Sequence, residues 1–205
     1  MTRPALPALV ADARIMVVAR RLGADAYAAL ESLAAAGEPV VFEVTLDDPA
    51  AVEIIARLRE AGHVVGAGTV LSVQQVDAAL AAGARFLVSP YLDEDVVRHA
   101  VAKGAAMVPG AMTPSEIARA WSLGASAVKV FPASVTGVAL FRELRGPLGH
   151  IPLMPTGGIG PDNAGEFIAH GAFAVGVGSW LTGGAPDGIA TRWAQLRTVV
   201  GDGGL

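Results

Sequence analysis

Short apolar runs alternate with longer amphipathic stretches along the whole chain. Eight runs rich in aliphatic residues have the length of strands, and the stretches between them repeat apolar residues at helical spacing. The predicted strands are Ile15–Ala19, Val40–Thr45, Val64–Gly68, Phe86–Ser89, Ala106–Val108, Ala127–Phe131, Leu153–Thr156 and Ala174–Val177. The predicted helices lie near residues 24–36, 50–61, 72–82, 92–103, 113–123, 137–144, 162–169 and 187–200.

Several predicted helices carry boundary signals. Thr113-Pro114-Ser115-Glu116 has the order of an N-cap, a proline in the first turn and a capping-box glutamate. Ser72 precedes the next helix in a similar way. Glycines follow five helices, as expected for left-handed positions after a helix end. They are Gly37, Gly62, Gly83, Gly104 and Gly171.

Eight βα units in a chain of 205 residues predict an α/β fold, a small (β/α)8 TIM barrel. Continuous apolar strands are typical of a parallel sheet covered on both faces. A doubly wound open sheet is the rival architecture, but the short and regular units favour the barrel. No linker divides the chain, so residues 1–205 are expected to form a single domain, with residues 201–205 as a frayed tail.

Composition narrows the class of protein. Hydrophobic residues make up 53% of the chain, which excludes a disordered protein, and no apolar run reaches the ~18 residues that span a bilayer. The first residues lack the apolar region of a signal peptide and there is no cysteine, so we expect a cytoplasmic protein without a membrane partner. The net charge of -4, with no basic cluster, argues against a nucleic-acid partner.

The choice of cations is unusual. Of the 15 lysines and arginines, only Lys103 and Lys129 are lysines. Lys103 precedes Gly104, where a cation suits the end of a helix. Lys129 lies inside the apolar run Ala127–Phe131, where a residue needed only for solubility has no place.

Lys129 and Glu43 are the ionisable residues inside predicted strands. Side chains alternate along a strand, so each points away from its valine neighbours, which suit contact with the helices. Both are therefore predicted to point into the barrel. Isolated buried charges are costly, so the two are expected to interact or to face a wet cavity. They form either an ion pair that only stabilises the fold or a functional site.

A buried amine next to a carboxylate suits covalent chemistry on carbonyl compounds. Burial disfavours the protonated form of a lysine, and the neutral amine can attack a carbonyl carbon to give a Schiff base. The iminium then acts as an electron sink for a neighbouring C–C bond. That chemistry needs a group that moves protons, and Glu43 is the candidate. The sequence therefore predicts a class I aldolase with Lys129 as its nucleophile.

Two glycine-rich segments, Pro155–Gly160 and Gly176–Trp180, follow the seventh and eighth predicted strands. TIM barrels often bind phosphate with these loops, because glycine lets backbone N–H groups approach the phosphate oxygens. Tight βα turns are the alternative interpretation. Thr156, at the end of the seventh strand, either caps the next turn or contacts substrate.

The segment Gly66-Ala67-Gly68-Thr69 is not a dinucleotide-binding motif, because Leu71 occupies the position of the third glycine. Gly66 and Gly68 are instead expected to leave room inside the barrel, and Thr69 to offer its hydroxyl to substrate. The four histidines are scattered, and none ends a predicted strand. They are His63, His99, His150 and His170. We therefore expect neither a metal site nor a cofactor, which argues against a class II aldolase.

The chain resembles the 2-keto-3-deoxy-6-phosphogluconate and 4-hydroxy-2-oxoglutarate aldolases from about Ile15 to Trp180. Each motif is modest, but their order and spacing are specific. The motifs are Phe42-Glu43-Val44-Thr45-Leu46, Gly66-Ala67-Gly68-Thr69-Val70, Val88-Ser89-Pro90, Pro109-Gly110, Lys129-Val130-Phe131-Pro132-Ala133, Pro155-Thr156-Gly157-Gly158 and Gly178-Ser179.

This resemblance implies a TIM barrel that assembles as a homotrimer. It also implies a Schiff-base cleavage of a small-molecule substrate to pyruvate and an aldehyde, glyceraldehyde 3-phosphate or glyoxylate. Lys129 is then the Schiff-base residue and Glu43 the general acid/base. The other matching positions imply substrate contacts from Arg20, Thr69, Pro90, Phe131 and Thr156, and phosphate contacts from Gly157, Gly158, Gly178 and Ser179.

Asp47 is a departure from the family pattern. Many members have an arginine there, four residues after the glutamate, that binds the substrate carboxylate. Arg20 matches an arginine of other members and is the expected replacement. The substrate stays open among the phosphogluconate form, the phosphogalactonate form and 4-hydroxy-2-oxoglutarate.

Two other functions share the phosphate loops: a phosphate-binding isomerase or epimerase, and a non-catalytic phosphosugar-binding protein. An isomerase would not need an amine in the sixth strand. The presence of both Lys129 and Glu43 argues against a protein that only binds phosphosugars.

Overall fold

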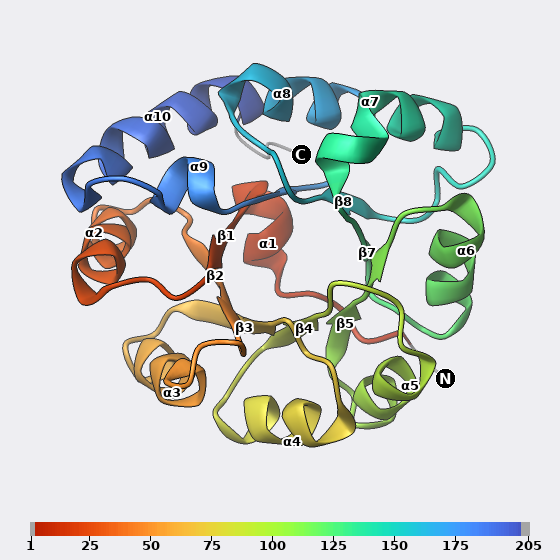
Figure 1. The fold of residues 1–205 in the computed structure, drawn as a ribbon, viewed down its shortest axis with the longest axis horizontal. Helices are drawn as coiled ribbons and strands as arrows, with labels where there is room; N and C mark the ends of the chain where they lie inside the picture. The colour runs from red at the N-terminus through yellow and green to blue at the C-terminus, as the bar shows by residue number, and fades with distance from the viewer. Residues whose placement is uncertain (1–2, 202–205) are drawn as a thin grey trace.

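The computed structural model describes residues 3–201 and has the predicted parallel barrel (Figure 1). Its strands are β1 (Ile15–Ala19), β2 (Val41–Thr45), β3 (Val64–Gly68), β4 (Phe86–Val88), β5 (Ala106–Val108), β6 (Gly110–Ala111), β7 (Val128–Val130), β8 (Leu153–Pro155) and β9 (Val175–Val177). Its helices are α1 (Ala8–Ala13), α2 (Ala24–Ala35), α3 (Ala51–Glu60), α4 (Val73–Ala81), α5 (Glu94–Ala102), α6 (Pro114–Ser122), α7 (Ala133–Leu144), α8 (Pro161–Ala169), α9 (Ser179–Thr182) and α10 (Ile189–Val200). Residues 202–205 of the predicted tail lie outside the described residues.

The strands pair in parallel and close into a ring. Six pair in the order β5-β4-β3-β2-β1-β9, and β6-β7-β8 form a second set. β5 and β6 form one strand interrupted at Pro109, which has no N–H to donate to the ladder. The Lys129 N–H donates to the Pro109 carbonyl over 2.9 Å, and a bridge between Thr156 and Gly176 joins β8 to β9. The predicted barrel is confirmed, with its fifth strand in two pieces.

Apolar side chains fill both sides of the ring of strands. Outward side chains such as Phe42 and Val128 pack against the surrounding helices α2 to α10, which encircle the strands in Figure 1. Inward side chains such as Met16, Val41 and Phe86 form a separate core inside the barrel. The alternation predicted from the sequence therefore places polar residues of the inward set at the barrel centre. Within residues 3–201, no helix combines the length and apolar character needed to cross a membrane.

The helix α1 was not predicted, and it closes the N-terminal end of the barrel. It has six residues and no side-chain cap, so neither length nor capping identifies it in the sequence. Val10 and Ala13 are buried, and both belong to the core inside the barrel. Tertiary packing therefore stabilises α1, whereas local sequence does not.

Two helix boundaries differ from the prediction. α7 begins at Ala133, four residues earlier than expected. Gly137, with φ of 63° and ψ of 179°, kinks the helix, so the sequence pattern did not indicate the turn that precedes it. A short helix α9 at Ser179–Thr182 precedes the last helix, which begins at Ile189 after a 3-10 turn at Pro186–Gly188. Both added turns lie in loops at the C-terminal ends of strands.

Candidate active site

Lys129 and Glu43 meet at the centre of the barrel. They come from β7 and β2, which lie opposite each other in the ring of strands. The Lys129 Nζ lies 3.4 Å from the Glu43 Oε1, and the two residues are 6% and 0% exposed. The prediction that both side chains point into the barrel is confirmed.

The pair is incompletely satisfied as an ion pair. A distance of 3.4 Å is longer than a tight charge-assisted hydrogen bond of about 2.7–2.9 Å. Among the described residues, the Glu43 Oε2 has no hydrogen-bond partner although it is buried. The Lys129 Nζ lies 5.3 Å from the centre of the Phe131 ring. A pair that served only stability would have its remaining polar atoms satisfied, so this geometry favours the functional interpretation.

Gly68 makes room for the Glu43 carboxylate. A Cβ atom at this position would lie 2.3 Å from the Glu43 Oε1 and 2.9 Å from its Cδ. Gly68 pairs with Thr45 in the register of β2 and β3, so its missing side chain leaves space on the inward face. The expectation that this glycine leaves room inside the barrel is confirmed.

A cavity of about 700 Å³ opens above the pair at the C-terminal ends of the strands. The predicted residues that line it are Arg20, Thr69, Pro90, Lys129, Phe131, Thr156, Gly157, Gly158, Gly178 and Ser179. Glu43 does not line the cavity, but it contacts Lys129, which does. Residues scattered over the sequence are thus brought together at the catalytic end of the fold.

The two glycine loops form one side of the cavity. Gly157 has φ of 91° and Gly158 has φ of 75°, both in the left-handed region, which turns the chain into α8. The Asn163 Oδ1 accepts from the Gly160 N–H at 3.1 Å, and its Nδ2 donates to the Gly158 carbonyl at 2.9 Å. Ser179 begins the short helix α9 on the neighbouring loop. The Asn163 bonds fix the loop in this conformation.

The Thr156 hydroxyl does not cap the following turn. Its Oγ1 is buried, and no hydrogen-bond partner exists for it within residues 3–201. Backbone bonds instead join this part of the chain to the start of α7, where the Ala133 N–H donates to the Thr156 carbonyl at 2.8 Å. Thr156 lines the cavity, which favours the interpretation that its hydroxyl contacts substrate.

A cationic group lies at the rim of the cavity next to the loop after β9, because β1 and β9 are neighbours in the sheet. The Arg20 Nη2 donates to the Thr69 Oγ1 at 3.2 Å, and the neighbouring Arg21 also lines the cavity. Partial burial opposes ionisation of Asp47, but the nearby Thr45 hydroxyl, Arg20 and Arg21 outweigh it and hold the pKa of this carboxyl below its ordinary value. Sequence reasoning missed Arg21, for which adjacency to Arg20 was the only signal.

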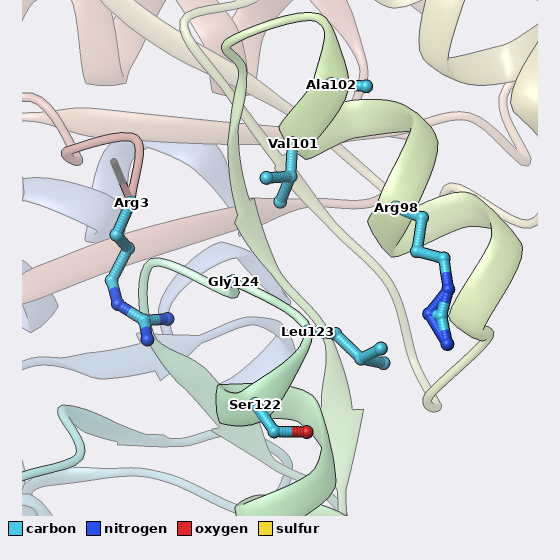
Figure 2. Close-up of a pocket in the computed structure, with 7 residues that line it drawn as sticks. All are labelled: Arg3, Arg98, Val101, Ala102, Ser122, Leu123 and Gly124. Atoms are coloured by element: carbon cyan, nitrogen blue, oxygen red, sulfur yellow. The ribbon is translucent and has the colours of Figure 1, made fainter. Parts of the chain in front are cut away.

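A second cavity, of about 580 Å³, lies at the other end of the barrel (Figure 2). It is lined by the C-terminal ends of α5 and α6, which lie at the N-terminal ends of the strands because the helices run back along the barrel. Figure 2 shows Arg3 reaching from the N-terminal segment toward the turn at Gly124. The Arg3 guanidinium stacks on the Trp121 ring and donates to the carbonyls of Trp121 and Ala125. These contacts hold the N-terminal segment against the end of α6. The cavity lies at the opposite end of the barrel from the one that Lys129 lines.

The histidines make contacts outside the cavity above Lys129. The His99 Nε2 lies 3.0 Å from the Asp77 Oδ1, and the His63 Nε2 lies 3.7 Å from the Glu31 Oε1. In the described part of the chain, no group of three histidine, cysteine, aspartate or glutamate side chains is placed to hold a metal ion.

Comparison with known proteins gives a consistent result. Residues 8–189 match the family described as KDPG and KHG aldolase. The 2-dehydro-3-deoxy-phosphogluconate aldolase of Treponema pallidum is 42% identical over 142 residues, 68% of either chain. The crystal structure of the 2-keto-3-deoxy-6-phosphogluconate aldolase of Zymomonas mobilis superimposes with a TM-score of 0.84 at 33% identity, covering 97% of both chains.

A further crystal structure bears on the chemistry of these relatives. The KDPG aldolase of Legionella pneumophila, with pyruvate captured as a covalent carbinolamine intermediate, matches with a TM-score of 0.80 at 27% identity. It covers 94% of this chain and 95% of its own. These similarities and the fold define a barrel enzyme of the lyase class. The chain belongs to the KDPG and KHG aldolase family.

Replacing Gly68 by alanine should disable the site without unfolding the protein. The added Cβ would displace the Glu43 carboxylate, and a misplacement of about 1 Å can cost about 10²-fold in rate. We expect aldol cleavage to fall by at least about 10²-fold. Gly146→Ala is the matched control, because no atom lies within 4 Å of a Cβ at that position. A Gly68→Ala variant with normal turnover would show that the position of Glu43 is unimportant.

Proposed function

We propose that the protein is a class I aldolase that forms a Schiff base between Lys129 and the carbonyl of a 2-keto acid. The observation that carries this proposal is the buried Lys129–Glu43 pair, which opens onto a cavity with a cationic rim and a glycine-rich rim. The pyruvate carbinolamine in the Legionella pneumophila relative supports the same chemistry. The expected substrate is a 2-keto-3-deoxy-6-phospho sugar acid or 4-hydroxy-2-oxoglutarate, cleaved to pyruvate and an aldehyde.

The first half of the reaction makes the imine. The Lys129 amine adds to C2 of the keto acid, and the resulting carbinolamine loses its hydroxyl as water. Glu43 is the acid that supplies the proton for this departure, since its Oε1 lies 3.4 Å from the same nitrogen.

The second half breaks the C3–C4 bond. A base removes the proton of the C4 hydroxyl, the C4–O bond becomes a carbonyl, and the bonding electrons flow into the iminium to give an enamine. Glu43 is the candidate base, directly or through a water molecule. Protonation of the enamine at C3 and hydrolysis of the imine then release pyruvate and regenerate the Lys129 amine.

The cavity suggests how the substrate lies. The glycine loops present backbone N–H groups near the start of α8, a favourable position for phosphate. Arg20 and Thr69, which follow β1 and β3, suit the carboxylate of the keto acid. Lys129 lines the same cavity, so its amine can reach the carbonyl carbon of a substrate held by both groups.

Trapping with borohydride tests the Schiff base directly. The wild-type protein mixed with pyruvate and borohydride should gain the mass of one reduced pyruvate per chain, and peptide mapping should place it on Lys129. The Lys129→Ala variant should gain no mass and should lose turnover, because no other amine lies in the cavity among the described residues. A wild-type protein that gains no mass at any pyruvate concentration would contradict the proposal.

Replacing Glu43 by glutamine tests the proton transfer. The Glu43→Gln variant keeps the size of the side chain but loses the acid, so turnover should fall by about 10² to 10⁴-fold. Steady-state kinetics of aldol cleavage measure this loss, with the unfolding temperature as a check on the fold. A rate near that of the wild type would assign proton transfer to another group.

We also propose that the protein assembles as a homotrimer, as the family resemblance implies. Sedimentation velocity at micromolar concentration should then give three times the mass of the 20.8 kDa chain. A monomeric mass would contradict the proposed trimer.

A further inference from the structure

The loop after β1 holds two arginines at the same rim of the cavity. Arg20 and Arg21 both line it, although neighbouring side chains on an extended chain point to opposite sides. Arg21 achieves this through a left-handed backbone with φ of 50°, which is sterically unfavourable for a residue with a side chain. The backbone strain brings the second guanidinium to the side of the first.

A second strained residue lies in the same group. Thr69 has φ of 55°, an outlier for a β-branched residue, and its hydroxyl accepts from Arg20. Among residues 3–201 only one other non-glycine residue has a positive φ, and this is Arg14, at the C-cap of α1. Strain of this kind persists where the surrounding structure imposes it, and it is concentrated at functional sites.

Asp47 lies between the two guanidinium groups. Its Oδ2 is 3.8 Å from the Arg20 Nε and 3.6 Å from the Arg21 Nε. Its backbone carbonyl accepts from the Arg21 Nε at 3.3 Å and Nη2 at 3.1 Å. One carboxylate thus compensates the repulsion between two like charges, and the Arg20 Nη groups are left on the side of Thr69.

We propose that Arg21 is a second specificity-determining cation for the substrate carboxylate, and that Asp47 is a positioning residue that holds Arg20 and Arg21 together. The inference rests on the proposed Schiff-base function. A carboxylate bound at this rim would accept hydrogen bonds from Arg20 and Thr69 and would lie in the field of Arg21. The three charged side chains sum to a single positive charge, which matches one carboxylate.

Replacement of Arg21 by glycine separates the cost of strain from the gain in binding. Glycine adopts a positive φ without steric penalty, so the Arg21→Gly variant should unfold at the same or a higher temperature. The pyruvate concentration that gives half-maximal borohydride trapping should nevertheless rise about tenfold, because the carboxylate loses its electrostatic attraction to Arg21. Trapping at saturating pyruvate should stay complete, because Lys129 is unchanged.

Arg14→Gly is the matched control. It makes the same chemical change at the other left-handed arginine, whose guanidinium donates to the Val200 carbonyl at the N-terminal end of the barrel. Half-maximal trapping should stay at the wild-type concentration in this variant. An Arg21→Gly variant with wild-type half-saturation would overturn the proposed role of Arg21.

The Asp47→Ala variant tests the positioning role through the direction in which its affinity for pyruvate changes. Removal of a negative charge from a cationic rim would by itself strengthen the binding of an anion. A higher half-saturating pyruvate concentration in Asp47→Ala therefore supports positioning, whereas an unchanged or lower concentration overturns it.

A calorimetric titration tests the role of Arg21 without formation of an imine. It compares the binding of pyruvate to the Lys129→Ala protein with its binding to the Lys129→Ala, Arg21→Gly double variant. Weaker binding in the double variant supports the role of Arg21 even if the wild type traps nothing, and equal binding overturns it.

Discussion

The burial of a lysine opposite a glutamate is the constraint on which the rest of this structure depends. Two ionisable groups inside a barrel are stable only when the barrel brings them within reach of each other. That requires a closed ring, because β2 and β7 are distant in sequence and meet across its centre. It also requires an empty position on β3, which Gly68 supplies. The 3.4 Å contact therefore requires both a closed parallel barrel and a glycine at position 68.

The sequence predicted what depends on periodic patterns. Strand alternation placed Glu43 and Lys129 inside the barrel, and the order of apolar runs gave the eight units. It did not predict α1, whose six residues are helical only because they pack against the barrel interior. It did not predict the interruption at Pro109 either, because a bent strand and a continuous one have the same apolar pattern. Tertiary packing decides both features.

The same distinction between periodic patterns and tertiary packing applies to the candidate site. Residues at strand ends could be predicted as a group, since all strands of a parallel barrel end on one face. Arg21 could not, because its contribution depends on a left-handed backbone that no residue pattern encodes for an arginine. The hydrogen bonding of the Thr156 hydroxyl could not be predicted either, since a threonine after a strand can equally well bond to its own turn.

The helix α1 and the core around Met16 and Phe86 close the N-terminal end of the barrel. Within the described residues 3–201, the Lys129 amine faces the cavity at the other end. In the proposed Schiff-base cleavage, one fragment stays attached to Lys129 at the closed end of the cavity. The unattached fragment occupies the way out and has to depart first. Combined with the proposed chemistry, this architecture imposes an order on product release, and in the synthetic direction the keto acid has to enter before its aldehyde partner.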